Sequence, residues 1–146
     1  MDKKIVVALI VLFLVVIAGA VLLAWPTPAQ NGHDSVESPF TSANVTVSSP
    51  VPSSTVPSSF TVIGRARGSW YFEASFPVEV RDANGNVVGR GLATSEGDWM
   101  TTEFVPFSAP VVIENYSGLA TLVLMKDNPS GLPEHDDSAS FLIVVQ

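Results

Sequence analysis

The apolar residues of this chain follow two different patterns. A continuous apolar block runs from Ile5 to Trp25 and contains no charge, proline or amide side chain. From Asn44 onward, short apolar runs alternate with turn residues, roughly every eight to twelve positions, and no window keeps the 3.6-residue period of an amphipathic helix. The two patterns predict a membrane-spanning helix followed by a β domain.

The apolar block at residues 5–25 has the length of a transmembrane helix. As a helix it would reach about 31 Å, which matches the hydrocarbon core of a bilayer. Lys3 and Lys4 precede it and no further Lys or Arg occurs before Arg65, so residues 1–4 are expected in the cytoplasm and the remainder outside. The alternative is a cleaved signal peptide, because residues 18–20 read Ala-Gly-Ala. The unbroken apolar sequence that continues to Trp25 favours an uncleaved anchor.

Residues 26–43 differ in composition from both neighbours. They are rich in Pro, Thr, Asn, Gly and Ser and contain almost nothing to bury, so we predict a flexible linker. The β domain is then expected over residues 44–146.

The alternating runs in the remainder predict seven to eight short strands. They are placed at residues 44–48, 59–67, 74–81, 87–94, 99–105, 111–114, 119–126 and 140–145. So many short strands in about 100 residues, without a helical segment, are typical of an all-β immunoglobulin-like antiparallel β-sandwich. The pattern does not determine the strand order.

One turn can be predicted in detail. Asp82 and Gly85 occupy the first and fourth positions of a type I turn, with Gly85 left-handed in a bulge. This loop would set Val80 opposite Val88 and Phe76 opposite Leu92. We prefer this register to the alternative, shifted by one residue, because it buries more carbon.

Composition narrows the function classes. The chain has 146 residues, a net charge of −7 and no cysteine. Its acidity disfavours nucleic acid as a partner, and the missing cysteines exclude disulfides and Cys-ligated metals. A domain of about 100 residues can still be held by its core alone.

Several landmarks, taken together, resemble a known family. They are Ser49-Pro50, Val56-Pro57, residues 63–68 (Ile-Gly-Arg-Ala-Arg-Gly), residues 70–73 (Trp-Tyr-Phe-Glu), residues 82–85, Gly97-Asp98-Trp99, residues 104–107 and residues 126–131. In this order and spacing they are similar to the immunoglobulin-like domain found beside the GerMN domain in bacterial spore-germination proteins. The resemblance covers roughly residues 44–146 and implies a bacterial envelope-associated β-sandwich without a catalytic motif. The GerMN partner is missing from this chain.

The aromatic cluster at residues 70–72 is the first candidate binding feature. Trp70 and Tyr71, together with Trp99, could form a platform for a sugar ring or for a partner's apolar anchor. The competing interpretation, which we favour, buries these rings in the core. Glu73 is expected to form a structural ion pair with Arg65 or Arg67, or to cap the backbone, more readily than to bind a ligand.

The loop from Asp127 to Asp137 is the second candidate. It contains Asn128 and His135 as well as several carboxylates, and long loops at the end of a sandwich often carry binding. Its oxygens could bind Ca²⁺, but no ligand spacing is fixed, so a solvated loop is favoured over a metal site.

No catalytic constellation stands out. His135 is the one histidine of the β domain, the sequence lacks a G-x-S-x-G elbow, and no zinc, phosphate-loop or dinucleotide motif occurs. We therefore expect a membrane-tethered, extracytoplasmic, non-enzymatic binding or structural module of a bacterial cell envelope. Its partner would be an envelope protein or polymer, with no cofactor and no small-molecule substrate. A carbohydrate- or peptidoglycan-binding module that uses the loop aromatics is the alternative.

Overall fold

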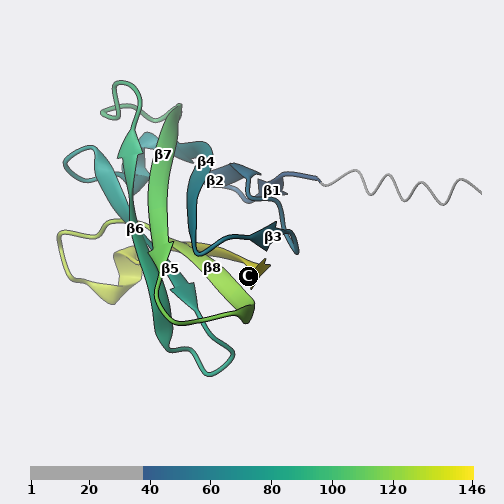
Figure 1. Cartoon of the computed structure of the whole chain (residues 1–146). Coiled ribbons are helices and arrows are strands. Elements are labelled where there is room, and N and C mark those ends of the chain that lie inside the picture. The colour runs from purple at the N-terminus through teal and green to yellow at the C-terminus, as the bar shows by residue number, and fades with distance from the viewer. Residues whose placement is uncertain (1–37) are drawn as a thin grey trace, which may run out of the picture. The chain divides into compact units, whose positions relative to one another are not determined.

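The computed structural model describes residues 38–146, which form nine β-strands and two single 3₁₀ turns (Figure 1). The strands are β1 (Phe40–Thr41), β2 (Val45–Ser49), β3 (Thr55–Val56), β4 (Ser59–Arg67), β5 (Ser75–Arg81), β6 (Val87–Ser95), β7 (Phe104–Ile113), β8 (Gly118–Met125) and β9 (Ser138–Val145). The 3₁₀ turns are η1 (Gly68–Trp70) and η2 (Pro133–His135). The predictions for residues 1–37, including the membrane helix at 5–25, lie outside the described residues. Within residues 38–146, no helix is long and apolar enough to span a membrane.

The strands pair in the order β1-β2-β4-β7-β6-β5-β8-β9-β3, and this continuous sheet folds over itself into two facing layers. Phe76 of β5 stacks edge-on against Phe107 of β7, with ring centroids 5.0 Å apart, although β6 separates these strands in the pairing order. Phe40 of β1 stacks on Phe141 of β9, with centroids 4.9 Å apart, although these strands lie near opposite ends of the order. The predicted all-β, immunoglobulin-like sandwich is confirmed, and the buried core residues of the described part run from Val45 to Val145.

Most predicted strands lie within one or two residues of their observed bounds, and the range of β4 is predicted correctly at both ends. The main difference is β7. We expected two strands, at 99–105 and 111–114, but one strand runs through Pro106 and Pro110. Both prolines are exposed, on the outer face. The β6–β7 ladder pairs Gly91 with Val111 and next Thr94 with Ser108, so it is interrupted beside Pro110, which has no N–H to donate.

The β5–β6 hairpin has the predicted turn but not the predicted register. The Gly85 N–H donates to the Asp82 carbonyl at 3.0 Å, and Gly85 has a φ of +84°. The expected pairing holds only for Arg81 with Val87, because a bulge then shifts the ladder by one residue. Val80 therefore pairs with Gly89, and the remaining pairs follow this shifted register.

Close approach between strands explains the shifted register. Gly89 and Gly91 face inward, and a Cβ on Gly91 would lie 2.5 Å from the Pro110 carbonyl oxygen of β7. The inner face of β6 is thus lined with small residues, which let the two strands approach closely. The register that we preferred would place Arg90 at the inward position of Gly91, opposite Val78, where even a Cβ meets the backbone of β7.

Two short strands were not predicted. β3 pairs in parallel with the end of β9 and directly follows the Ser- and Pro-rich residues 48–54. β1 pairs with β2, setting Phe40 opposite Val47, so the domain begins before Asn44 and the last residues of the predicted linker belong to it. Phe40 is the one large apolar side chain of that segment, and its ring is partly buried against the core.

The turn at Asp82 makes stability depend on pH. One Asp82 carboxylate oxygen accepts the N–H groups of Asn84 and Asn86, each at 2.8 Å, and the Asn86 side-chain amide donates to the other. The Asn86 side chain contributes most to lowering the Asp82 pKa below its ordinary value of 3.8. A carboxyl whose pKa is lower in the folded state stabilises the fold above its unfolded pKa, and this stabilisation is lost as pH falls through the folded pKa.

We therefore expect Asp82→Asn to flatten the acid side of the stability profile. Urea unfolding of residues 38–146 between about pH 5 and pH 3 should show a smaller loss of stability in the variant than in the wild type. Parallel profiles for the two proteins would contradict this prediction.

Candidate functional site

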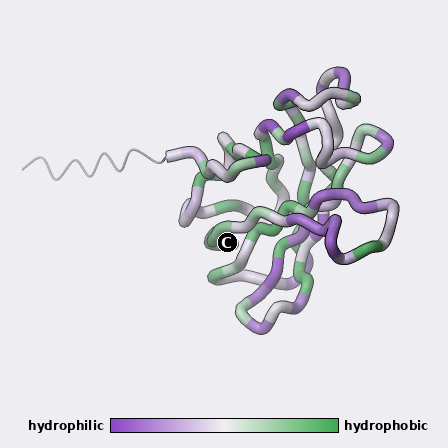
Figure 2. Tube along the Cα trace, turned by 180° about the vertical axis from the view of Figure 1, so that it is seen from behind, coloured by the Kyte–Doolittle hydropathy of each residue, from purple (hydrophilic) through white to green (hydrophobic). Residues whose placement is uncertain are grey.

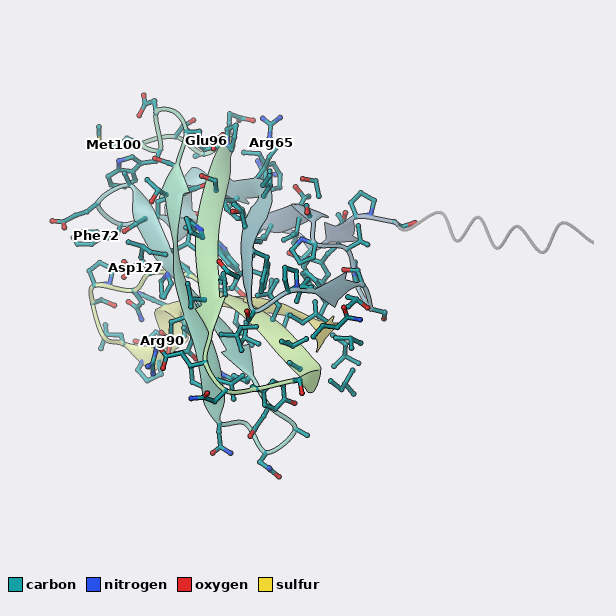
Figure 3. All side chains as sticks on the ribbon, in the orientation of Figure 1. Arg65, Phe72, Arg90, Glu96, Met100 and Asp127 are labelled. Atoms are coloured by element: carbon teal, nitrogen blue, oxygen red, sulfur yellow. The ribbon has the colours of Figure 1, made fainter. Side chains whose placement is uncertain are left out.

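A hollow under the loop 127–137 is the main concave surface among the candidate residues. It has a volume of about 630 Å³ and lies where β5, β8 and β9 meet this loop. The residues that line it are Pro77, Met125, Lys126, Asp127, Asn128, Asp136, Asp137 and Ser138. Figure 2 shows that most of the loop is hydrophilic, and Figure 3 shows Asp127 at its start. Two of the predicted site residues, Asp127 and Asn128, therefore belong to one surface.

Asn128 holds the loop together from within. Its side-chain amide donates to the Leu132 carbonyl at 2.8 Å and to the Asp136 carboxylate at 2.7 Å. Its side-chain carbonyl oxygen accepts the backbone N–H and the hydroxyl of Ser130. One side chain thus bridges three parts of the loop, which gives the rim of the hollow a defined shape. Sequence reasoning gave Asn128 as a metal-ligand candidate and did not find this bridging role.

The loop is also fastened to the sandwich at its base. The Asp127 N–H donates to the Trp70 carbonyl at 3.0 Å, and the Lys126 N–H donates to the Asp137 carbonyl at 2.9 Å. The Lys126 ammonium group donates to the His135 carbonyl at 2.8 Å. The side-chain amide of Asn44, the residue before β2, donates to the Asp137 carboxylate at 2.9 Å. These contacts join both ends of the loop to the core.

His135 lies on the outer part of this loop and contacts Ser130, which the sequence analysis did not single out. The Ser130 hydroxyl lies 3.2 Å from Nδ1 of His135 and donates to the side-chain oxygen of Asn128 at 2.5 Å. The contact joins two parts of the loop.

The carboxylates of the loop do not converge. Among residues 38–146, no group of three or more acidic or histidine side chains is placed to hold a metal ion. Asp136 is engaged by Asn128, and Asp137 by Asn44.

Trp70 and Tyr71 are core residues. They are 2% and 4% exposed, and both rings contact Phe76 edge-on. Nε1 of Trp70 has no hydrogen-bond acceptor among residues 38–146. Trp99 is partly buried against the same core. A sugar platform would need at least two of these three rings to be exposed, so the carbohydrate-binding alternative based on them is wrong. The apolar core offers these large rings more burial than the loops do.

Tyr71 joins the core to β7 through its hydroxyl. The hydroxyl donates to the Val105 carbonyl at 2.8 Å, and burial raises the Tyr71 pKa to about 12. We expect Tyr71→Phe to lower the free energy of unfolding by about 1–2 kcal/mol, because it removes a buried hydrogen bond with little change in packing. Urea unfolding of the two proteins at neutral pH measures this difference. An unchanged midpoint would show that the bond contributes nothing.

Glu73 does not form the predicted ion pair. Arg65 donates instead to the Phe104 carbonyl at 2.9 Å, and Arg67 donates to the Thr102 carbonyl at 3.1 Å. Glu73 is exposed in a turn with a φ of +49°, and this turn directs it into solvent. Among residues 38–146, both ion pairs use Glu79 of β5, which contacts Arg81 at 2.8 Å and Arg90 at 3.8 Å.

The fold and this loop-bearing end define an immunoglobulin-like sandwich module. The family model of the immunoglobulin-like domain of bacterial spore germination matches residues 44–132, so the chain belongs to this family. Comparison with curated proteins and with solved structures gave no match. The family match confirms the resemblance inferred from the sequence landmarks, and it ends before β9.

Proposed function

We propose that this protein is a non-enzymatic protein-binding module that the apolar segment at residues 5–25 tethers to the outer side of a bacterial membrane. The observation that carries the binding role is the hollow of about 630 Å³ beside a loop that is held in one shape by Asn128. A surface that is already ordered loses little conformational entropy when a partner binds. The family, an immunoglobulin-like domain of bacterial spore germination, supports a non-enzymatic module.

The lining of the hollow favours a protein segment as the ligand. Met125 and Pro77 provide apolar contact area, whereas Asp127, Asp136 and Lys126 provide charges of both signs. Mixed apolar and polar linings of this kind are typical of transient protein interfaces. The acidic balance of the domain disfavours nucleic acid.

Photo-crosslinking from the hollow tests the binding role. A photoreactive amino acid at Ser138, which is exposed and lines the hollow, should trap a discrete partner when the full chain is expressed in its own cells. The matched control is the same amino acid at Ser117, an exposed loop residue outside the hollow. No crosslinked species from Ser138, or the same species from both positions, would contradict the proposal.

The tether is tested separately. A reporter enzyme that is active only outside the cytoplasm, fused after Gln146, should be active, and the fusion should remain in the membrane after carbonate extraction. An inactive reporter, or a protein released by carbonate, would contradict this part of the proposal and leave the binding role to the crosslinking result.

A further inference from the structure

Most charges of opposite sign lie in different kinds of element in the described domain. All four arginines lie in strands, at outward-facing positions, whereas every Asp and Glu of residues 38–146 except Glu79 lies in a loop or turn. One molecule thus has a basic sheet exterior and acidic loops. Two surfaces of the domain, one basic and one acidic, also expose large apolar side chains.

The first surface is the outer face of β4, β7 and β6, which we call the arginine face. It is defined by Ile63, Arg65, Arg90, Leu92, Pro110 and Val112. Arg90 pairs directly with Val112 across β6 and β7, and its side chain is 75% exposed. Leu92 and Val112 are 53% and 55% exposed. An apolar strip bordered by arginines is therefore open to solvent.

The lower part of the arginine face is hollowed. A depression of about 470 Å³ lies between β6 and β7 and is lined by Val87, Val88, Gly89, Arg90, Val112, Glu114 and Asn115. Glu79 contacts Arg81 more closely than Arg90, at 2.8 Å against 3.8 Å. Arg90 therefore retains donors for a carboxylate on an incoming surface.

The second surface is the loop of residues 96–103, which we call the acidic loop. It contains Glu96, Asp98 and Glu103 and no basic residue, and its Met100 is 77% exposed. The Met100 N–H donates to the Asp98 carboxylate at 3.0 Å, and Trp99 packs against the core, so the loop has a defined shape. Figure 3 shows Met100, Glu96 and Arg65 at one end of the domain and Arg90 far down the sheet. In one molecule the acidic loop is therefore separated from Arg90.

We propose that the arginine face of one copy binds the acidic loop of a second copy. Met100 would lie against Leu92 and Val112, where a thioether adapts well to an irregular apolar surface. The carboxylates of Glu96 and Glu103 would face Arg90. The opposite charges of the two surfaces would set the orientation of the interface. The apolar area that both surfaces expose would stabilise it. Because the arginine face and the acidic loop are different surfaces, the contact is head-to-side. One end of the assembly then keeps an unoccupied arginine face, and the other end keeps an unoccupied acidic loop.

Sedimentation of the fragment 38–146, which contains all nine described strands, tests this proposal. Its mean mass should rise with concentration between about 10 µM and about 1 mM, and raising the salt from about 50 mM to 500 mM should weaken the association several-fold. Arg90→Glu and Leu92→Glu should each weaken it at least about tenfold. The matched control for Leu92→Glu is Leu119→Glu, because Leu119 is 54% exposed on β8, away from the arginine face.

Exchanging the charges on the two surfaces distinguishes the proposed contact from nonspecific association. The double variant Glu96→Lys with Glu103→Lys should fail to associate alone, and so should Arg90→Glu. Mixing the two should restore association, since a lysine-bearing loop then meets a glutamate-bearing face. A wild-type mass that stays at one chain at about 1 mM, or association that none of these variants weakens, would overturn the proposal.

Discussion

Replacing Phe76 with alanine is expected to lower the free energy of unfolding by about 3–5 kcal/mol. Phe76 is fully buried, and its ring contacts Trp70, Tyr71 and Phe107 at centroid distances of 5.8, 5.1 and 5.0 Å. Removing the ring takes away the group that links the two layers and leaves a cavity between them. Urea unfolding of residues 38–146, monitored by tryptophan fluorescence, measures the loss of unfolding free energy.

Phe72 provides the matched control for this substitution. It lies four positions earlier in the chain but is 42% exposed, in the turn before β5. We expect Phe72→Ala to cost less than about 1 kcal/mol. Comparable losses at the two positions would contradict the view that Phe76 is at the centre of the core.

Replacing Gly68 with alanine is expected to cost about 3 kcal/mol or more. A Cβ on Gly68 would lie 2.0 Å from the Thr101 carbonyl oxygen and 2.4 Å from that of Trp99. Both neighbours are backbone atoms, so the acidic loop would have to move as a unit. The Gly68 N–H also donates to the Glu103 carbonyl at 3.0 Å, which ties the two segments together.

The control for Gly68→Ala is Gly97→Ala, in the same loop. The nearest atom to a Cβ on Gly97 is 3.8 Å away, so this substitution should change stability by less than about 1 kcal/mol. Thermal or urea unfolding of both variants makes the comparison. Equal effects would show that the close approach at Gly68 is relieved without cost.

The positions of most strands could be predicted because alternation reports which side chains are buried. In β5, Phe76, Val78 and Val80 alternate with outward residues, and all three are buried as expected. Alternation fails where backbone contacts decide the structure. One strand, β7, runs through Pro106, because an outward-facing proline is tolerated where the ladder leaves its nitrogen unpaired.

The candidate site was only partly predictable. The loop 127–137 was recognised by its length and composition, and Asp127 and Asn128 do line the hollow. The contact between Ser130 and His135 depends on the fold of the loop, which no spacing rule specifies. Glu73 was matched with the arginines of β4 from expected proximity, but backbone carbonyls take those donors.

The parallel pairing of β3 with β9 has a consequence for where the domain can be cut. The family match ends at residue 132, but β9 supplies Phe141 and Ile143 to the core and lies between β8 and β3. A truncated protein that stops at 132 would leave the whole length of β8 as a bare edge with exposed N–H and C=O groups. Such an edge recruits strands from other chains, so this truncation is expected to yield insoluble aggregates.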